Sequence, residues 1–404
     1  MFQCVNFYLL GMVGDMPFMP LAVLPMWILG LLSLALLLGG GYIMYEWWQG
    51  ILLSTLVFAA GIAMLVLTLL GRFLVLAFHR RGEDDPSWAR DGKTQLLERP
   101  DGTLLHVEIS GPSEALPVIL VHGWGVDNRA FYYTKRSLSA RHRVITWDLR
   151  GLGNSSRGSN NDYSLDAMAD DLAAIADLAD APAVILGHSI GGMIMLTFAR
   201  RHADRLKSDV VALVLVATTY TDPTRTMLGA SVMHTLERPL LRPLMYLTIA
   251  LSPIVWAMNW LSYISGLQLL ATALSGFTGA QTRGQLDFAS RFFAKARPSV
   301  LARGMLAMFN FDETSSIGNI PVPVLIVPGN RDPVLLPQAS ERMASVIPQS
   351  TLVGLAPAKH MGLMERYVEF NAILAQFIDA HATVRVRRDT TGNPLNNRIG
   401  FGAT

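Results

Sequence analysis

Long uncharged runs of apolar residues dominate the first 71 positions of the chain. Residues 16–45 carry no charged side chain, and a second uncharged apolar run covers 51–71. A helix needs roughly 20 residues to cross a hydrocarbon core of about 30 Å, so the pattern predicts two membrane spans, at about 21–41 and 51–71. The connector between them carries rings typical of a bilayer interface, namely Tyr42, Tyr45, Trp47 and Trp48.

Two other interpretations of this N-terminal pattern are disfavoured. A buried helical hairpin in a soluble protein would need a very large core to cover both runs. A cleaved signal peptide fits poorly, because there is no basic n-region and a second apolar run follows. We therefore expect residues 1–80 to form a transmembrane helical hairpin in the lipid bilayer.

Basic residues are absent up to position 71 and frequent immediately after it. The positive-inside rule places such a basic flank in the cytoplasm. The sequence therefore predicts an integral membrane protein with a short outer loop, a cytoplasmic N-terminus and a cytoplasmic catalytic domain. The flank consists of Arg72, Arg80, Arg81, Arg90 and Lys93.

From about residue 95 the pattern changes to short β-rich runs that alternate with helical segments. The run 104–110 alternates between apolar and polar positions, whereas later runs are continuously apolar, which is typical of parallel strands covered on both faces. A helical segment at 164–179 has Ser164 as its expected N-cap. This alternation predicts a doubly wound α/β sheet. The continuous runs are 117–123, 143–149, 183–187, 210–217 and 322–329.

The long interval between the last two of these strands has helical character instead. Residues 243–282 hold no charged side chain. As a third membrane span, this segment would be interrupted by Pro253 and would break the order of the sheet. We favour a helical lid over the sheet, with an apolar face against the membrane. The predicted division is a core at 95–219 and 319–382, a lid at 220–318 and a flexible tail at 383–404.

Charge and cysteine content exclude several other classes. The formal net charge is only +2, so we expect no nucleic-acid partner. The single cysteine, Cys4, excludes an internal disulfide framework. No histidine or cysteine cluster has the spacing of a metal site, so we expect neither a metal nor a cofactor. The oligomeric state stays open.

A serine stands between glycines where the predicted strand 183–187 ends and a helical periodicity begins. This is the strand–turn–helix context in which the pattern G-x-S-x-G presents a nucleophile on a strained turn. Gly187 and Gly191 lack side chains and so let the strand and the helix approach each other, while the helix directs its positive N-terminal end at the turn. Ser189 is therefore the candidate nucleophile, with Gly187 and Gly191 as its elbow glycines.

A serine hydroxyl becomes nucleophilic when a histidine takes its proton and a carboxylate orients that histidine. On turns of this kind the acid and then the histidine follow the serine along the chain. Asp332 comes directly after the predicted strand 322–329, and His360 follows the short apolar segment 350–356. Together with Ser189 they form a candidate catalytic triad.

The remaining acids and histidines are weaker candidates. Asp148 precedes the serine and is expected to brace its own loop, and Asp312 and Glu313 precede a strand instead of following one. His188 is expected to be a pocket or packing residue, and His381 has no strand before it.

Acyl transfer also needs donors for the developing oxyanion, each worth about 10²–10³ in rate. The glycine-rich turn at 121–125 ends an early strand and can direct amides at the serine. The backbone N–H groups of Trp124 and Ile190 are the candidate donors. Mere chain reversal is the alternative interpretation of this turn.

Five motifs resemble, in order and spacing, those of the α/β-hydrolase superfamily, and the resemblance covers about residues 95–380. Within it the chain is similar to the lipase and esterase branch, in particular to membrane-anchored monoacylglycerol-lipase-like hydrolases. The resemblance implies that Ser189 is the nucleophile, His360 the base and then the acid, and Asp332 its orienting group. It implies the same two oxyanion donors. The motifs are HGWG, DLRGLGNSS, GHSIGG, GNRDPVLLP and KHMGLME.

The chain departs from that pattern at two places. Many relatives have glycine before the catalytic histidine, where this chain has Lys359, and the anchor is a hairpin instead of a single span. Neither departure touches the candidate triad, but both loosen the assignment of a substrate.

The expected function is that of a membrane-anchored serine hydrolase that cleaves small-molecule or lipid-like acyl esters through an acyl-enzyme. A serine at the elbow disfavours epoxide hydrolases and dehalogenases, whose nucleophile is an aspartate. A carbon–carbon bond hydrolase, a cofactor-free haloperoxidase-like enzyme and a catalytically silent membrane scaffold stay open as alternatives. The uncharged segment 243–282 argues against the first, whose carboxylate substrate should need positive contacts in the lid.

Overall fold

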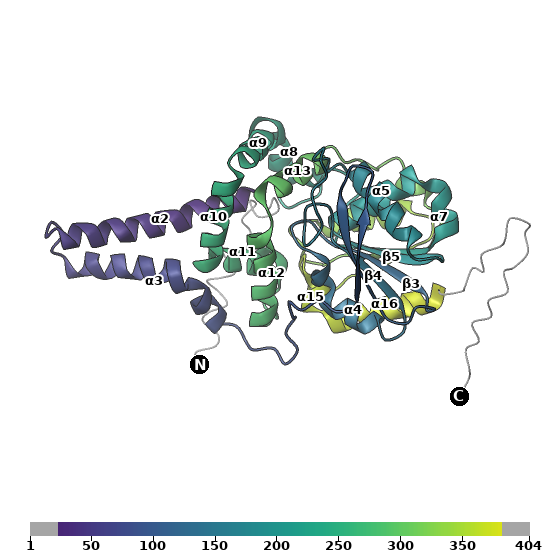
Figure 1. Ribbon diagram of the computed structural model, residues 1–404, viewed down its shortest axis with the longest axis horizontal. Coiled ribbons are helices and arrows are strands. Elements are labelled where there is room, and N and C mark those ends of the chain that lie inside the picture. Colours follow the sequence, from purple (N-terminus) through teal and green to yellow (C-terminus); the bar gives the residue numbers. More distant parts are fainter. Residues whose placement is uncertain (1–22, 382–404) are drawn as a thin grey trace, which may run out of the picture.

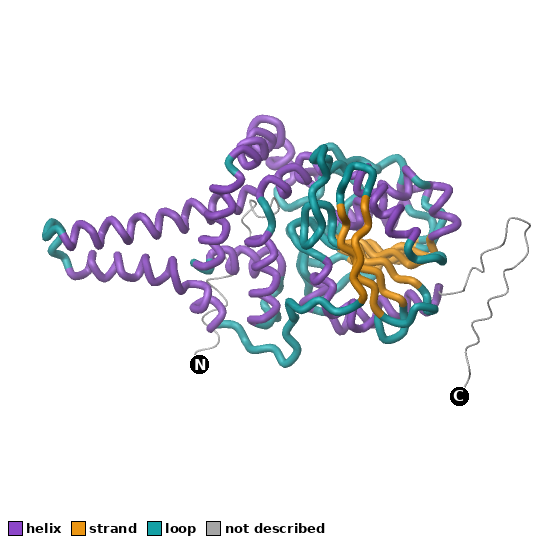
Figure 2. Tube along the Cα trace, in the orientation of Figure 1, coloured by secondary structure: helices purple, strands orange, loops and turns teal. Residues whose placement is uncertain are grey.

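The computed structural model describes residues 23–381. The predicted flexible tail at 383–404, Cys4 and the beginning of the first predicted span lie outside the described residues. The described chain contains one sheet of eight strands (Figures 1 and 2). The strands are β1 (Lys93–Glu98), β2 (Leu104–Ser110), β3 (Pro117–Val121), β4 (Arg143–Trp147), β5 (Ala183–His188), β6 (Val210–Val216), β7 (Val324–Val327) and β8 (Ser350–Leu352).

The order of the strands is β1-β2-β4-β3-β5-β6-β7-β8, and the sheet is mostly parallel. Only the β1–β2 and β2–β4 pairs are antiparallel. The predicted α/β architecture is therefore confirmed, and each apolar run marked in the sequence forms a strand. β1 escaped prediction because it is an edge strand whose alternate side chains are exposed, so it has no continuous apolar run.

Helices cover both faces of the sheet. α5 (Leu165–Asp177) and α6 (Ile190–Arg201) pack with Ile185 and the other side chains of one face, whereas α4 (Tyr132–Leu138) and α16 (Tyr367–His381) pack with Val184 and those of the other face. Ser164 caps α5, since its hydroxyl accepts a hydrogen bond from the Ala167 amide at 3.1 Å. The remaining core helices are α7 (Ala203–Asp209), α14 (Pro337–Val346) and α15 (Gly362–Glu365).

A cap of helices is inserted between β6 and β7 and lies between the sheet and the N-terminal hairpin (Figure 1). The chain bends by 97° between residues 230–250 and 252–264, at the break just before Pro253. By length and composition alone, this bent pair could also be a single broken span. The cap helices are α8 (Ala230–Leu236), α9 (Arg242–Ala250), α10 (Ser252–Ile264), α11 (Leu267–Gly276), α12 (Arg283–Lys295) and α13 (Pro298–Met308).

The N-terminal hairpin consists of α2 (Val23–Trp48) and α3 (Thr55–Ala77), both long and apolar enough to cross a membrane. The aromatic segment that the sequence analysis assigns to the connector belongs to the last turns of α2. Its rings sit on a helix because nothing in 42–48 breaks the helical backbone, and the turn begins at Gln49. Figure 1 shows the hairpin tip at the end of the molecule farthest from the sheet.

Small residues fasten the hairpin to the cap. A Cβ added at Gly30 would lie 2.8 Å from Cβ of Met258, and one at Gly71 would lie 2.1 Å from the Ser265 carbonyl oxygen. At such positions two backbones approach closely, as helices in membranes commonly do. The hairpin and the cap therefore form one packed unit.

We expect Gly71→Ala to destabilise the protein, because the new methyl group would push α3 away from the Ser265 carbonyl. Overpacking of this kind costs about 1–3 kcal/mol. Gly41→Ala is the matched control, since a Cβ there meets nothing within 4 Å. Thermal unfolding of both variants in detergent measures the difference, and equal melting temperatures would contradict the close packing.

Candidate active site

Ser189 occupies a strained turn between β5 and α6. Its backbone φ of 56° and ψ of −121° lie in a region that residues other than glycine rarely adopt. Two hydrogen bonds hold the turn: the Ser189 amide donates to the Val216 carbonyl at 2.9 Å, and the Thr218 hydroxyl donates to the Ser189 carbonyl at 2.7 Å. The chain thus maintains a costly backbone conformation that projects the serine from the sheet.

The two predicted elbow glycines make this turn sterically feasible. A Cβ at Gly191 would lie 2.1 Å from the Val121 carbonyl oxygen, and one at Gly187 would lie 2.4 Å from the backbone of Gly191. A real Cβ cannot approach backbone atoms so closely. α6 can therefore lie directly against the ends of β3 and β5 only because both positions lack side chains.

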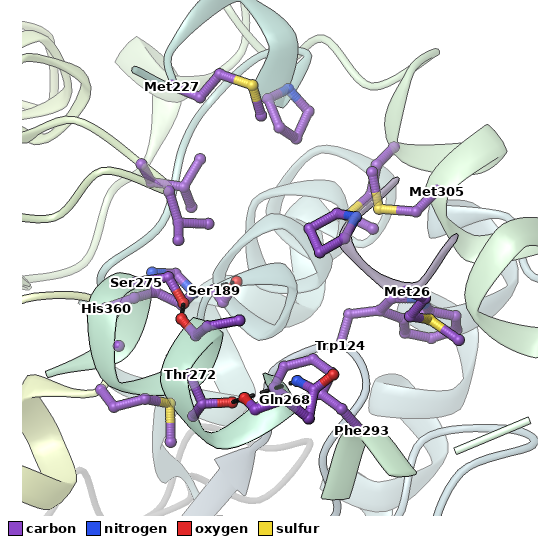
Figure 3. Close-up of a pocket in the computed structure, with 18 of the residues that line it drawn as sticks. Met26, Trp124, Ser189, Met227, Gln268, Thr272, Ser275, Phe293, Met305 and His360 are labelled. Atoms are coloured by element: carbon purple, nitrogen blue, oxygen red, sulfur yellow. Dashed lines mark hydrogen bonds between the residues drawn. The ribbon is translucent and has the colours of Figure 1, made fainter. Parts of the chain in front are cut away.

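The structure brings the three predicted triad residues together. His360 Nε2 lies 3.1 Å from Ser189 Oγ, and His360 Nδ1 lies 2.7 Å from Asp332 Oδ2 (Figure 3 shows Ser189 and His360). The other oxygen of Asp332 accepts hydrogen bonds from the amides of Val334 and Leu335. With Nδ1–H donating to the carboxylate, a neutral imidazole leaves Nε2 free to accept the serine proton.

The weaker acid candidates have structural partners elsewhere. Asp148 is buried and accepts hydrogen bonds from the Asn128 and Asn154 amides and from the Arg90 guanidinium, so it braces its loop as expected. Asp312 accepts a hydrogen bond from the Thr314 amide. Glu313 accepts one from Arg200.

The two other candidate histidines also have separate partners. His188 is buried, its Nε2 lies 3.0 Å from the His360 carbonyl oxygen, and burial lowers the pKa of His188 to about 3. It is therefore a neutral packing residue that donates to the backbone of the histidine loop. His381 ends α16 and lies 2.9 Å from the Phe377 carbonyl oxygen.

The predicted oxyanion loop lies against the serine. A Cβ at Gly123 would be 3.5 Å from Cβ of Ser189, so the turn that carries Trp124 adjoins the elbow. His122 holds this turn: the Leu149 amide donates to its Nε2 at 2.9 Å, and its Nδ1 lies 2.8 Å from the Gly123 carbonyl oxygen. Burial lowers the pKa of His122, which keeps that ring neutral. Ile190 supplies the second predicted amide at the first position of α6.

The candidate triad opens into an apolar cavity of about 140 Å³. Methionines line much of its wall, and among the described residues no lysine, arginine, aspartate or glutamate does. One polar stripe comes from α11, where Gln268, Thr272 and Ser275 follow helical spacing. Gln268 Oε1 is buried there without a hydrogen-bond partner among the described residues. The lining methionines are Met26, Met193, Met227, Met305, Met308 and Met361.

Sequence reasoning missed this lining almost entirely. The uncharged segment 243–282 signalled an apolar cap, but not which of its faces meets the serine. Pro25 and Met26 belong to the hairpin, and no local pattern relates them to Ser189. Figure 3 shows Met26 and Gln268 at the cavity wall, together with Trp124 of the predicted oxyanion loop.

One trio outside this cavity gathers possible metal ligands among the described residues, namely Asp222, His234 and Glu237. Protein groups already meet the two carboxylates. Asp222 accepts hydrogen bonds from the amide and hydroxyl of Thr224, and Glu237 pairs with Arg242. The trio is therefore explained as part of the fold at the start of the cap.

A mostly parallel sheet whose strand-end loops bring together a strained serine, a histidine and an acid defines an α/β hydrolase. The chain matches the alpha/beta hydrolase family over residues 118–373 and belongs to that family. This confirms the superfamily resemblance, while the monoacylglycerol-lipase-like branch stays a prediction.

Proteins similar to this chain include bacterial esterases. The pimeloyl-[acyl-carrier protein] methyl ester esterase of Chromobacterium violaceum is 28% identical over 265 residues, which are 66% of this chain and 95% of that protein. A thermophilic esterase from Thermogutta terrifontis has a TM-score of 0.58 at 22% identity and covers 72% of this chain and 100% of its own. A bromoperoxidase from Bacillus anthracis has the same TM-score at 19% identity, covering 71% and 100%. The two solved structures show the fold. The family match and the esterase relative support the assignment of this chain as a hydrolase.

The two buried aspartates near the site should respond differently to the same substitution. Asp332→Asn retains the side-chain shape but removes the acceptor of the His360 Nδ1 proton, so we expect kcat for ester hydrolysis to fall about 10⁴-fold, as in other triads of this type. Its melting temperature should change little. Asp148→Asn should lower the melting temperature, because it weakens the pairing of the buried Asp148 carboxylate with Arg90, and should leave measurable hydrolysis.

Paired kinetic and thermal-unfolding measurements on the two variants test this assignment. If Asp148→Asn abolished turnover in a stably folded protein while Asp332→Asn remained active, Asp332 would not be the orienting acid.

Proposed function

We propose that this chain is a membrane-anchored serine hydrolase that cleaves uncharged, lipid-like acyl esters through an acyl-enzyme. One observation carries the proposal: the hydrogen-bonded series Asp332–His360–Ser189 opens into a cavity with an apolar wall. The relative from Chromobacterium violaceum, which is named for hydrolysis of a methyl ester, supports ester chemistry.

The reaction follows from the positions of the three side chains. His360 Nε2 takes the proton as Ser189 Oγ attacks the ester carbonyl carbon, and the carbonyl π electrons move onto oxygen. The amides of Trp124 and Ile190 donate to that oxyanion. The C–O bond to the alcohol then breaks, and His360 returns its proton to the leaving oxygen. A water activated by the same histidine releases the acid, while Asp332 stays ionised throughout.

The cavity lining favours a neutral substrate. Methionine side chains adapt to flexible apolar groups such as acyl chains. A substrate with a free carboxylate would need a cation, and the part of the cavity lining that the structure describes includes no lysine or arginine. This argues against the carbon–carbon bond hydrolase alternative.

The proposed organisation has an anchor at 1–80, a catalytic core at 95–219 and 319–382, and a lid at 220–318. The basic residues after the second helix support a cytoplasmic catalytic core. Both helices of the anchor have the length of a membrane span, which supports insertion as a hairpin.

A fluorophosphonate probe and an ester panel test the proposal on the full-length protein in detergent. We expect the wild-type protein to be labelled at Ser189 and to hydrolyse p-nitrophenyl esters and monoacylglycerols, with preference for long acyl chains. Ser189→Ala should lose both the label and turnover. Preference for short soluble esters would contradict the lipid-like substrate, and an unlabelled, inactive wild-type protein would favour the silent scaffold.

A further inference from the structure

The first turns of membrane helix α2 form part of the cavity that contains Ser189. Pro25 and Met26 line it, and Met26 is only 1% exposed. Figure 3 shows Met26 on the same wall as Trp124 and Met305. A helix that served only as a membrane anchor would not need to contact the site, so α2 has a second structural role.

Specific contacts hold this end of α2 in place. The Trp27 indole N–H donates to the Thr248 hydroxyl at 2.8 Å, and the hydroxyls of Ser33 and Ser265 lie 2.9 Å apart. Met26 therefore lies on a segment fixed to α9 and to the end of α10, and its position relative to Ser189 is set by packing.

The length of the hairpin places this wall at membrane depth. From Ser33, where α2 leaves the cap, to Trp48 there are 15 residues, or about 22 Å at 1.5 Å per residue. A hydrocarbon core is about 30 Å thick and needs roughly 20 residues. The part of α2 beyond the cap is therefore shorter than a full span. A span of about 20 residues, counted back from the interfacial ring of Tyr45, reaches Pro25 at the cavity.

The surface of the cap is consistent with immersion, in the bilayer, of the side that is nearest to the hairpin. Exposed apolar side chains continue from the hairpin onto the cap. Arg72 at this level makes a two-fold hydrogen-bonded ion pair with Asp287, which also accepts a hydrogen bond from the Tyr263 hydroxyl. The exposed apolar residues of α9, α10 and α11 are Tyr246, Leu247, Ile254, Trp256, Ile264 and Leu270.

We propose that α2 is both a membrane helix and a wall of the substrate site, and that Met26 determines which acyl chains fit. The cap is immersed in the leaflet of the bilayer that is nearest to the catalytic core, so that the cavity receives an uncharged acyl ester directly from the bilayer. This inference rests on the proposed esterase function for its substrate, whereas the immersion of the cap does not depend on that function.

Shortening and enlarging the side chain at position 26 tests the specificity role. Met26→Ala should raise kcat/KM for the longest p-nitrophenyl ester relative to the shortest about tenfold, and Met26→Phe should lower that ratio by a similar factor. Met44→Ala is the matched control: it removes the same side chain from the same helix, near the hairpin tip, and should leave the ratio unchanged.

The outcomes separate the inference from the proposed function. Wild-type hydrolysis with the same chain-length profile in all three variants would overturn the role of Met26 and leave the esterase intact. No hydrolysis of any ester by the wild-type protein would instead overturn the proposed function. Met26→Ala leaves a cavity and so destabilises the contact between α2 and the cap. Met26→Phe adds volume at the same position and is therefore an independent test, with melting temperatures measured for each variant.

Thiol labelling tests the immersion without any reference to catalysis. In a Cys4→Ser background, Leu270→Cys on the cap and Leu352→Cys on β8 place thiols where the native side chains are 45% and 40% exposed. In vesicles with the catalytic core outside, a water-soluble maleimide should label the β8 thiol several times faster. Both should react equally after denaturation. Equal rates in the vesicles would overturn the immersion of the cap.

Discussion

Parallel pairing of β5, β6, β7 and β8 is the constraint on which the rest of the site depends. Parallel neighbours bring their carboxyl ends to one edge, so loops far apart in the sequence meet there. Ser189 follows β5, Asp332 follows β7, and His360 follows β8. Two hydrogen bonds, of 3.1 and 2.7 Å, then connect residues separated by up to 171 positions. The strained serine turn persists because neighbouring strands and α6 hold it from several sides.

The insertion of the cap between β6 and β7 connects this edge to the hairpin. The Lys359 ammonium donates to the Leu274 carbonyl at the end of α11, and the Met361 amide donates to the Gly276 carbonyl. Both residues flank His360, so the histidine loop is fastened directly to the cap. The lysine that stands where many relatives have glycine therefore has a structural explanation in this chain. A displacement of α11 would therefore shift the loop that carries the His360 imidazole.

The sequence predicted those features that depend on neighbouring residues. Continuous apolar runs mark strands buried on both faces, and the glycines around Ser189 mark a turn that tolerates no Cβ. β1 was missed because an exposed edge strand lacks such a run, and the aromatic end of α2 was assigned to a loop although its backbone continues as a helix. Met26 lies outside such reasoning altogether. Its contact with the site arises from packing between segments more than 150 positions apart.

The chemistry of the joint between hairpin and cap bears on where the membrane surface lies. In water, apolar burial alone can hold two helices together, whereas in lipid the surrounding tails are as apolar as the helices themselves. Association there relies on close backbone approach and on hydrogen bonds. The joint has both: glycines at positions 30 and 71, the Ser33–Ser265 hydroxyl pair, and the Trp27–Thr248 bond. The ion pair at this joint between Arg72 and Asp287 is bidentate and supported by Tyr263, which is the arrangement that a charge near hydrocarbon requires. These contacts support the proposal that the cap is immersed in the bilayer, with its joint to the hairpin at the level of the cavity.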